Sequence, residues 1–396
     1  MSRRSGDLAG AYRNRPAVGL VGFFGWGNYG DELFLQLWKR VLSPHFDVSV
    51  VHDLLTPPYV SRDPEAVADA YDALVIGGGD LVLTDQLSEL YWRREWLRRP
   101  VYICGVGATL HDRIRRQPVI DQMAEFFGHP NVQYISARDD ESAAWIRTHL
   151  RPRVPVEVHP DLVFALPLPP PDPGLLQTGG RPTLGVSVRQ GKFGQDNDYS
   201  GLASLVEAAR DRGYAVSVLE LGNGRQRHRD TPALAQLPFV PDSVVSERSP
   251  EQISAAIGAL TVSATMKFHG LVVGLRYGVP SLALSPNTKN SALLEAIGRP
   301  DLVGDLEPGL DLAPRLRALE EPWDTGTVRA LERQAATALE AVVRQMRLQL
   351  NPTSYLPRSV PGLAETLEAL PSAAALARRR VRLARVDREN RRARRR

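Results

Sequence analysis

Residues 263–270 read SATMKFHG and lie between two apolar runs, Gly258–Val262 and Leu271–Gly278. A strand-length apolar run, a break and a longer apolar run predict a strand, a turn and a helix, with Lys267 and His269 in the first helical turn. A first turn carries backbone N–H groups without helical partners and the positive end of the helix dipole. A lysine there adds a full charge, so the stretch predicts an anion-binding site.

The rarity of lysine favours a functional role for Lys267. The chain has 49 Lys and Arg residues, but its only lysines are Lys39, Lys192, Lys267 and Lys289. A generic surface cation in this chain would therefore be Arg, and the compact ammonium of Lys does not substitute for a planar guanidinium. The role of His269 stays open, because a single histidine near an apolar face is often a hydrogen-bonded structural residue.

Composition indicates a soluble protein with room for two domains. The chain has 396 residues, 43% of them hydrophobic, and no uninterrupted apolar run near 18 residues. The polar start at residues 1–16 lacks the apolar segment of a signal peptide, and a single cysteine, Cys104, cannot build a disulfide framework. We therefore expect a cytoplasmic protein.

The basic charge of the chain belongs to its C-terminal tail. The net charge is +4, yet residues 377–396 hold 11 Arg against Asp387 and Glu389, so the rest of the chain is net acidic. Such a run is typical of a solvated tail or of peripheral contact with an anionic membrane, and both readings stay open. The run has no interleaved aromatic residues, so we expect no nucleic-acid partner.

An apolar strand near the start leads into residues 25–30, which read GWGNYG, and then into a helical pattern. This is the G-x-G-x-x-G pattern of dinucleotide-binding proteins, and Asp53 follows at the distance of a ribose-binding acid. Against that interpretation, Asp31 and Glu32 put negative charge where a pyrophosphate would bind. Carboxylates there suit a hydroxyl-rich ligand, or they simply stabilise the helix N-terminus.

Further predicted strands end in glycines or charged residues. They are Asp72–Ile76 before Gly77–Asp80, Val101–Cys104 before Gly105–Gly107, Val132–Ser136 before Arg138, and Thr183–Val188 before Arg189. Strands that alternate with helices predict parallel, doubly wound sheets, which bind ligands at the carboxyl ends of their strands. A proline-rich linker at Leu166–Pro173 marks a domain boundary.

The sequence therefore predicts an α/β protein of two Rossmann-like domains. We expect the first domain over residues 1–168 and the second over 175–325. Residues 326–375 form a C-terminal helical segment long enough to cross back over the first domain, and the Arg-rich tail occupies 376–396.

Several motifs in the same order resemble the polysaccharide pyruvyl transferase family. They are Gly22–Glu32, Gly77–Asp80, Gly105–Gly107, Arg138-Asp139 with Ser142, Pro160-Asp161, Arg189, His269-Gly270 through Pro280, and Lys289. The resemblance implies a glycosyltransferase-B-like arrangement and transfer of a pyruvyl unit from phosphoenolpyruvate to two hydroxyls of a sugar. It also implies an acceptor site in the first domain, for a sugar or a free or lipid-linked glycan, and a phosphoenolpyruvate site in the second.

The resemblance also implies roles for individual residues. As catalytic residues we expect His269 as the acid, Lys267 as a cation that holds the donor phosphate, and Asp31 as a carboxylate that orients or deprotonates an acceptor hydroxyl. The substrate-binding residues we expect are Arg189, Lys192 and Lys289 for the donor, and Gly27, Asn28, Gly78, Gly79, Asp80, Gly107, Arg138 and Asp161 around the acceptor. No cluster has metal-ligand spacing, so we expect no cofactor beyond phosphoenolpyruvate as co-substrate.

One departure from the family keeps alternatives open. The family usually has Arg-Leu-His where this chain has Lys267, Phe268 and His269, and Lys lacks the bidentate geometry of Arg. The alternatives are a nucleotide-sugar-dependent glycosyltransferase, a catalytically weak binding protein and, with less support, a nicotinamide-dependent oxidoreductase at residues 25–30.

Overall fold

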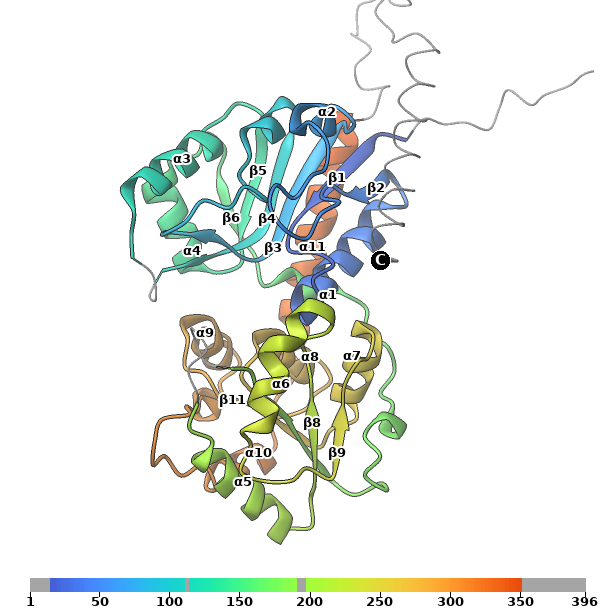
Figure 1. The fold of residues 1–396 in the computed structure, drawn as a ribbon, viewed down its shortest axis with the longest axis vertical. Coiled ribbons are helices and arrows are strands. Elements are labelled where there is room, and N and C mark those ends of the chain that lie inside the picture. The colour runs from blue at the N-terminus through green and yellow to red at the C-terminus, as the bar shows by residue number, and fades with distance from the viewer. Residues whose placement is uncertain (1–14, 111–113, 191–196, 351–396) are drawn as a thin grey trace, which may run out of the picture.

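The structure, a computed structural model, describes residues 15–110, 114–190 and 197–350. It has two lobes, each built on a parallel β-sheet with helices on its faces (Figure 1). This confirms the predicted pair of Rossmann-like domains. Lys192, residues 351–375 of the predicted C-terminal helical segment, and the tail at 376–396 lie outside the described residues.

The first lobe contains a six-stranded sheet in the order β2-β1-β3-β4-β5-β6. Its strands are β1 (Ala17–Val21), β2 (Asp47–Val50), β3 (Ala73–Leu83), β4 (Val101–Thr109), β5 (Val132–Ala137) and β6 (Val156–Val158). Its helices include α1 (Tyr29–Leu42), α2 (Pro64–Ala68), α3 (Gln117–Phe127), α4 (Asp140–Trp145) and the short η3 (Leu162–Ala165).

The second lobe contains a five-stranded sheet in the order β11-β10-β7-β8-β9. Its strands are β7 (Thr183–Ser187), β8 (Ala215–Leu219), β9 (Ser243–Val245), β10 (Val262–Thr265) and β11 (Ser281–Ala283). Its helices include α5 (Ser200–Asp211), α6 (Arg227–Ala235), α7 (Pro250–Gly258), α8 (Phe268–Arg276), α9 (Thr288–Ala296) and α10 (Arg315–Glu320).

The strand order of each sheet reverses once, between β1 and β3 in the first lobe and between β7 and β10 in the second. Such a reversal opens a crevice at the carboxyl ends of the strands, where doubly wound folds bind ligands. Helix α1, which follows β1, lies where the two lobes meet (Figure 1). Both crevices therefore face the junction between the lobes.

The glycine-rich strand ends were predicted wrongly. The expected strands stopped at Ile76 and Cys104, but β3 continues to Leu83 and β4 to Thr109. Gly78 and Gly79 adopt φ of +102° and +83°, and the pairing of β3 with β4 shifts register just after them. Glycine tolerates this left-handed backbone, so the chain forms an irregularity within a paired strand instead of a turn that ends it.

The strand expected at Gly258–Val262 was also misplaced. Helix α7 begins with a capping box between Ser249 and Gln252 and ends at Gly258, and β10 starts at Val262. Residues 253–257 of α7 are buried without interruption and the helix continues to Gly258, so the run predicted as a strand begins at the end of a buried helix. Lys267 is consequently the N-cap of α8, one residue before its first turn.

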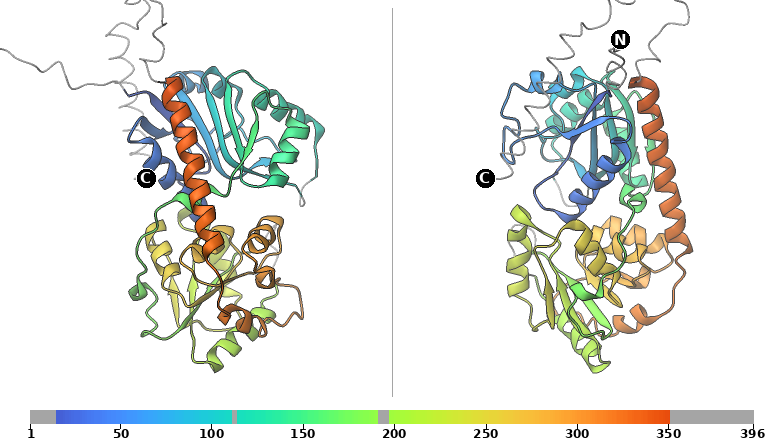
Figure 2. Two further views of the ribbon diagram at one scale, coloured as in Figure 1. Left: turned by 180° about the vertical axis from the view of Figure 1, so that it is seen from behind. Right: turned by 90° about the vertical axis from the view of Figure 1, so that its right-hand side faces the viewer.

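Helix α11 (Gly326–Leu350) runs along both lobes (Figure 2). Glu332 near its start pairs with Arg276 of α8 at 2.8 Å, and Gln345 near its end donates to the carbonyl of Gln133 in β5 at 3.1 Å. The helix therefore ties the second lobe to the first. None of the helices in the described ranges has the length and apolar character needed to cross a membrane.

Candidate active site

The two lobes are joined by main-chain hydrogen bonds next to α1. Tyr29 N–H donates to the carbonyl of Leu221 at 3.0 Å, and Asn223 N–H donates to the carbonyl of Gly27 at 2.7 Å. Between them, Asn28 pairs with Gly222 as an isolated antiparallel bridge. We call Gly27–Tyr29 together with Leu221–Asn223 the docking bridge. A Cβ at Gly27 would lie 2.0 Å from the carbonyl oxygen of Asn223, so the bridge requires glycine there.

The docking bridge removes the basis of the dinucleotide interpretation. The N–H groups of Gly25 and Gly27 donate to a carboxylate oxygen of Glu32 at 2.6 and 3.1 Å. A pyrophosphate would need such N–H groups, but Glu32 occupies those of Gly25 and Gly27, and Leu221 of the second lobe occupies that of Tyr29. The last glycine of the pattern, Gly30, is needed for a different purpose: a Cβ there would lie 2.0 Å from Nδ1 of His269.

Charged and titratable side chains from both lobes gather at this junction. We call them the interlobe cluster: Asp31, Asp80, Arg138, Asp161, His269 and Lys289. All lie at or beyond the carboxyl halves of strands, or in the helices that follow them. The structure thus brings together residues that the sequence placed in separate motifs.

Arg138 is the central cation of the first lobe. Its side chain is only 4% exposed, contacts Asp80, and lies 3.6 Å from Asp161 and 3.9 Å from Asp139. Burial disfavours its charge, but these carboxylates outweigh burial and raise the pKa of Arg138. A Cβ at Gly107 would lie 2.6 Å from Arg138 Nε, so this glycine provides the space that the guanidinium fills.

Asp80 receives one cation from each lobe. Besides Arg138, its carboxylate accepts a 2.9 Å hydrogen bond from Nζ of Lys289 in the second lobe. Burial opposes ionisation of Asp80, yet the two cations hold its pKa well below the usual range. Burial also lowers the pKa of Lys289, with Asp80 opposing that shift and Arg138 and Arg189 adding to it. The positive charge of Arg189 therefore reaches the cluster.

Phe268 lies between the two cations of the cluster. Its ring centre is 5.1 Å from Cζ of Arg138 and 5.3 Å from Nζ of Lys289, within the range of cation–π attraction. The residue that departs from the usual leucine of the family thus contacts a cation from each lobe.

His269 faces Asp161 across the junction. Its Nε2 lies 3.5 Å from the Oδ2 atom of Asp161, and its ring meets the ring of Phe34 edge-on at 5.6 Å. Burial would raise the pKa of Asp161, but His269, Arg138 and the N–H of Val163 outweigh it and hold the pKa below its usual value. An ionised carboxylate beside an imidazole can fix the orientation of the ring.

Asp31 is a carboxyl group tuned near neutral pH. Burial raises its pKa to about 7, against the hydrogen bond that it accepts from the side-chain amide of Asn28. A Cβ at Gly79 would lie 3.2 Å from Oδ1 of Asp31, so the glycine keeps this side of the carboxyl group open. A carboxyl group with such a pKa can exchange protons at physiological pH. Gly78 instead lies against the ring of Phe34.

The other two expected donor ligands occupy different surroundings. Nζ of Lys267 pairs with the fully buried Asp230 of α6 at 2.7 Å. The backbone of Arg189 is held by Asn197, whose amide donates to its carbonyl at 2.8 Å, and by the hydroxyl of Tyr199 at 3.3 Å.

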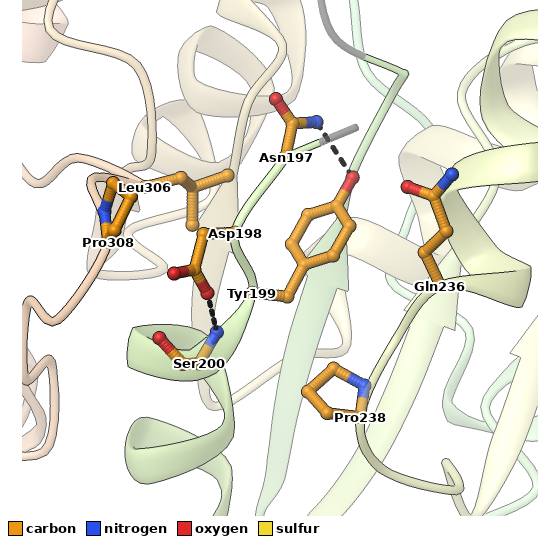
Figure 3. A pocket seen from close by; sticks show the side chains of 8 residues that line it. All are labelled: Asn197, Asp198, Tyr199, Ser200, Gln236, Pro238, Leu306 and Pro308. Carbon is orange, nitrogen blue, oxygen red and sulfur yellow. Dashed lines mark hydrogen bonds between the residues drawn. The ribbon is translucent and has the colours of Figure 1, made fainter. Parts of the chain in front are cut away.

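A cavity of about 650 Å³ opens beside these two anchors of Arg189 (Figure 3). Its lining is Asn197, Asp198, Tyr199, Ser200, Gln236, Pro238, Leu306 and Pro308. A second cavity of about 330 Å³ adjoins the docking bridge and is lined by Trp26, Glu32 and Arg248, among others. Within the described part of the chain, no three His, Cys, Asp or Glu side chains are grouped as a metal ion requires.

Asp230 and Glu32 are carboxylates that hold backbone N–H groups near the docking bridge, and the sequence pattern did not indicate this. Asp230 lies in an Arg-rich segment, where an acidic residue looks like part of a solvated surface. Glu32 was read as a helix-terminal charge, whereas it reaches back to the loop before α1. The one sequence signal for this role is that Glu32 follows Gly25 and Gly27 closely enough for its carboxylate to reach back to their N–H groups.

Comparison with known proteins identifies the family. A family model described as polysaccharide pyruvyl transferase matches residues 28–288, about two thirds of the chain. This range includes every member of the interlobe cluster except Lys289, which follows its last residue, and it confirms the resemblance drawn from the motifs. The curated proteins contain no match.

Solved structures share the two-lobed fold at low sequence identity. UDP-N-acetylglucosamine 2-epimerase from Rickettsia bellii is 10% identical with a TM-score of 0.54, covering 85% of this chain and 99% of its own. S. aureus MnaA, in a co-structure with UDP, is 11% identical with a TM-score of 0.50, covering 85% of this chain and 97% of its own. The calicheamicin glycosyltransferase CalG4 is 14% identical with a TM-score of 0.45, covering 88% and 100%. The epimerase and MnaA structures show that this chain has the two-lobed α/β, glycosyltransferase-B-like fold expected from its sequence.

The contact between Gly30 and His269 yields a prediction that separates stability from activity. Alanine is favoured over glycine within a helix by roughly 0.5–1 kcal/mol, so Gly30→Ala should keep the protein folded. Its Cβ would displace the imidazole of His269, and a shift of about 1 Å can cost about 100-fold in rate. We expect a melting temperature within a few degrees of the wild type and about a 100-fold lower kcat. Wild-type turnover in this variant would show that the position of His269 is not critical.

Proposed function

Because the chain belongs to the polysaccharide pyruvyl transferase family, we propose that it transfers a pyruvyl group from phosphoenolpyruvate to two hydroxyls of a sugar or glycan, releasing phosphate. The observation that carries the proposal is the pairing of His269 in the second lobe with Asp161 in the first, 3.5 Å apart. This pairing joins an acid–base group to the cations and carboxylates of the interlobe cluster, of which Arg138 is buried and Asp80 and Lys289 are partly exposed.

The first step is protonation of the donor. Protonated His269 delivers its proton to the methylene carbon of phosphoenolpyruvate, and positive charge develops at the adjacent carbon. A sugar hydroxyl adds to that carbon while Asp31, in its carboxylate form, takes the hydroxyl proton. The carbon–oxygen bond to phosphate then breaks, and a second hydroxyl closes the cyclic ketal. Of the two hydroxyl protons, one restores the proton that His269 gave and the other protonates the leaving phosphate.

The cations would neutralise the donor. Phosphoenolpyruvate carries a carboxylate and a phosphate, and we assign these groups to Arg189 and Lys289, together with Lys192. Lys289 is already turned into the junction by Asp80, and the charge of Arg189 reaches it there. Asp80, Arg138 and Asp161 then orient the acceptor hydroxyls. Neutralisation by fixed cations stabilises the leaving phosphate electrostatically.

The alternative is a glycosyltransferase that uses a nucleotide-sugar donor. The glycosyltransferase-B fold is compatible with it, because structures of that architecture with bound UDP exist. A fold does not specify a reaction, so the choice rests on the site and the family. The nicotinamide-dependent alternative is disfavoured by the occupied N–H groups of Gly25 and Gly27.

Phosphate release tests the proposed reaction. With phosphoenolpyruvate and a panel of sugars, we expect the purified protein to release phosphate only when an accepted sugar is present. His269→Gln should lower this rate by about 100-fold or more and leave phosphoenolpyruvate affinity within about tenfold, because an acid acts on the transition state. His228→Gln, at an exposed histidine of α6, is the matched control and should keep the wild-type rate. Release of nucleotide from UDP-sugars without phosphate release would support the alternative instead.

The raised pKa of Asp31 predicts a pH dependence. Its carboxylate fraction increases as pH rises through about 7, so a rate that needs Asp31 as a base should rise over the same interval. Asp31→Asn should remove this rise and lower kcat by about 100-fold or more. Asp121→Asn, at an exposed carboxyl group of α3, should leave the profile unchanged. A persistent rise near pH 7 in Asp31→Asn would assign the titration to another group.

We also propose that the Arg-rich tail holds the protein at an anionic membrane, on the cytoplasmic side where a lipid-linked acceptor would be available. Each basic residue near an anionic surface contributes about 1 kcal/mol, and salt weakens the attraction. Deleting Arg378–Arg396 should abolish salt-sensitive sedimentation with anionic vesicles and leave the rate with soluble acceptors unchanged. Equal vesicle binding by the full and truncated chains would leave the tail without this role.

A further inference from the structure

We infer that Lys267 is a positioning residue: with Asp230 it holds the docking bridge and thereby places Asp31 of the opposite lobe. The inference rests on the proposed function for the role of Asp31. It differs from the sequence-based expectation that Lys267 binds the donor. The contacts that carry it run from Lys267 to Asp31 in three links.

The first link is a buried ion pair. Asp230 is fully buried, and its Oδ2 atom accepts from Nζ of Lys267 at 2.7 Å and from the N–H of Gly222 at 2.6 Å. A buried carboxylate needs a compensating charge, and removing that charge strongly destabilises the groups around it. The lysine therefore sustains the bond that Asp230 makes to Gly222.

The second link is the packing of Leu221–Asn223, the second-lobe side of the docking bridge, against α8. A Cβ at Gly270 would lie 2.9 Å from a methyl carbon of Leu221, and a Cβ at Gly222 would lie 2.9 Å from Asp230 Oδ2. The backbone of Lys267 is itself fixed, because its N–H donates to the hydroxyl of Thr265 at 3.1 Å. The start of α8 and the side chain of Lys267 thus hold the loop from two directions.

The third link crosses to the first lobe. Gly222 pairs with Asn28 in the docking bridge, and the side-chain amide of Asn28 donates to Asp31. A displacement of Gly222 therefore moves the donor that holds the Asp31 carboxylate. The other groups that act on the charge of Asp31 are Glu32, Asp80, Tyr91 and Lys289.

The test compares two readouts for Lys267→Met and Asp230→Asn. The first readout is turnover. If Lys267 is a positioning residue, Lys267→Met should lower kcat by about 10- to 100-fold and shift or flatten the pH dependence near 7. The KM for phosphoenolpyruvate should stay within about threefold. Asp230→Asn should do the same, and the double variant should be no worse than either single one, because the two residues act as a pair. Lys267→Arg, which can also pair with Asp230, should restore kcat.

The second readout needs no turnover. Hydrogen exchange at the amides of Tyr29 and Asn223 should accelerate at least tenfold in both variants, since these amides form the docking bridge. Arg181→Met is the matched control, because it breaks an ion pair with Asp242 in the same lobe away from the bridge. If the protein proves inactive with phosphoenolpyruvate, the exchange measurement still decides the inference.

Two results would overturn the inference. One is unchanged exchange at the bridge in both folded variants. The other is a rise of tenfold or more in the KM for phosphoenolpyruvate in Lys267→Met that Asp230→Asn does not share, which would make Lys267 a direct ligand of the donor.

Discussion

Everything at the candidate site depends on the short main-chain pairing between Gly27–Tyr29 and Leu221–Asn223. His269 lies in one lobe and its carboxylate partner Asp161 in the other, so neither lobe contains the pair by itself. Peptide hydrogen bonds fix both distance and register, whereas surface ion pairs between lobes would be weak and mobile. Glycine at position 27 is the steric condition for this contact.

The electrostatics of the cluster follow from burial across the same junction. Isolated buried charges are costly, so each cation is matched by carboxylates: Arg138 by three, and Lys289 by Asp80. The balance of burial and neighbouring charge separates the carboxyl groups by pKa. Asp80 and Asp161 are held ionised by neighbouring cations, while Asp31, which relies mainly on an amide, keeps a pKa of about 7. Environment rather than residue type distinguishes these three aspartates.

The departure from the usual Arg-Leu-His of the family has a structural context in this chain. Lys267 engages a buried aspartate within its own lobe, and Phe268 presents its ring to cations from both lobes. A planar guanidinium and a compact ammonium make different contacts, so the change of residue accompanies a change of partner. Positive charge at the junction then comes from residues beyond this stretch, among them Lys289 within the cluster and Arg189, whose charge acts on Lys289.

The sequence by itself determined the fold class, the carboxyl-end location of the site and most of its charged residues. Alternating strands and helices impose a parallel sheet. The local pattern places Arg138 and Asp161 after strands, whereas Asp80 proved to lie within the carboxyl half of β3. Only the tertiary structure decided what these residues contact. Gly30 makes room for His269 and Glu32 occupies the glycine loop, while Asp230 captures Lys267 from a segment that looks like solvated surface. The physical reason is that periodicity reports the face of an element, whereas pairing between lobes depends on the path of the whole chain, which no local window contains.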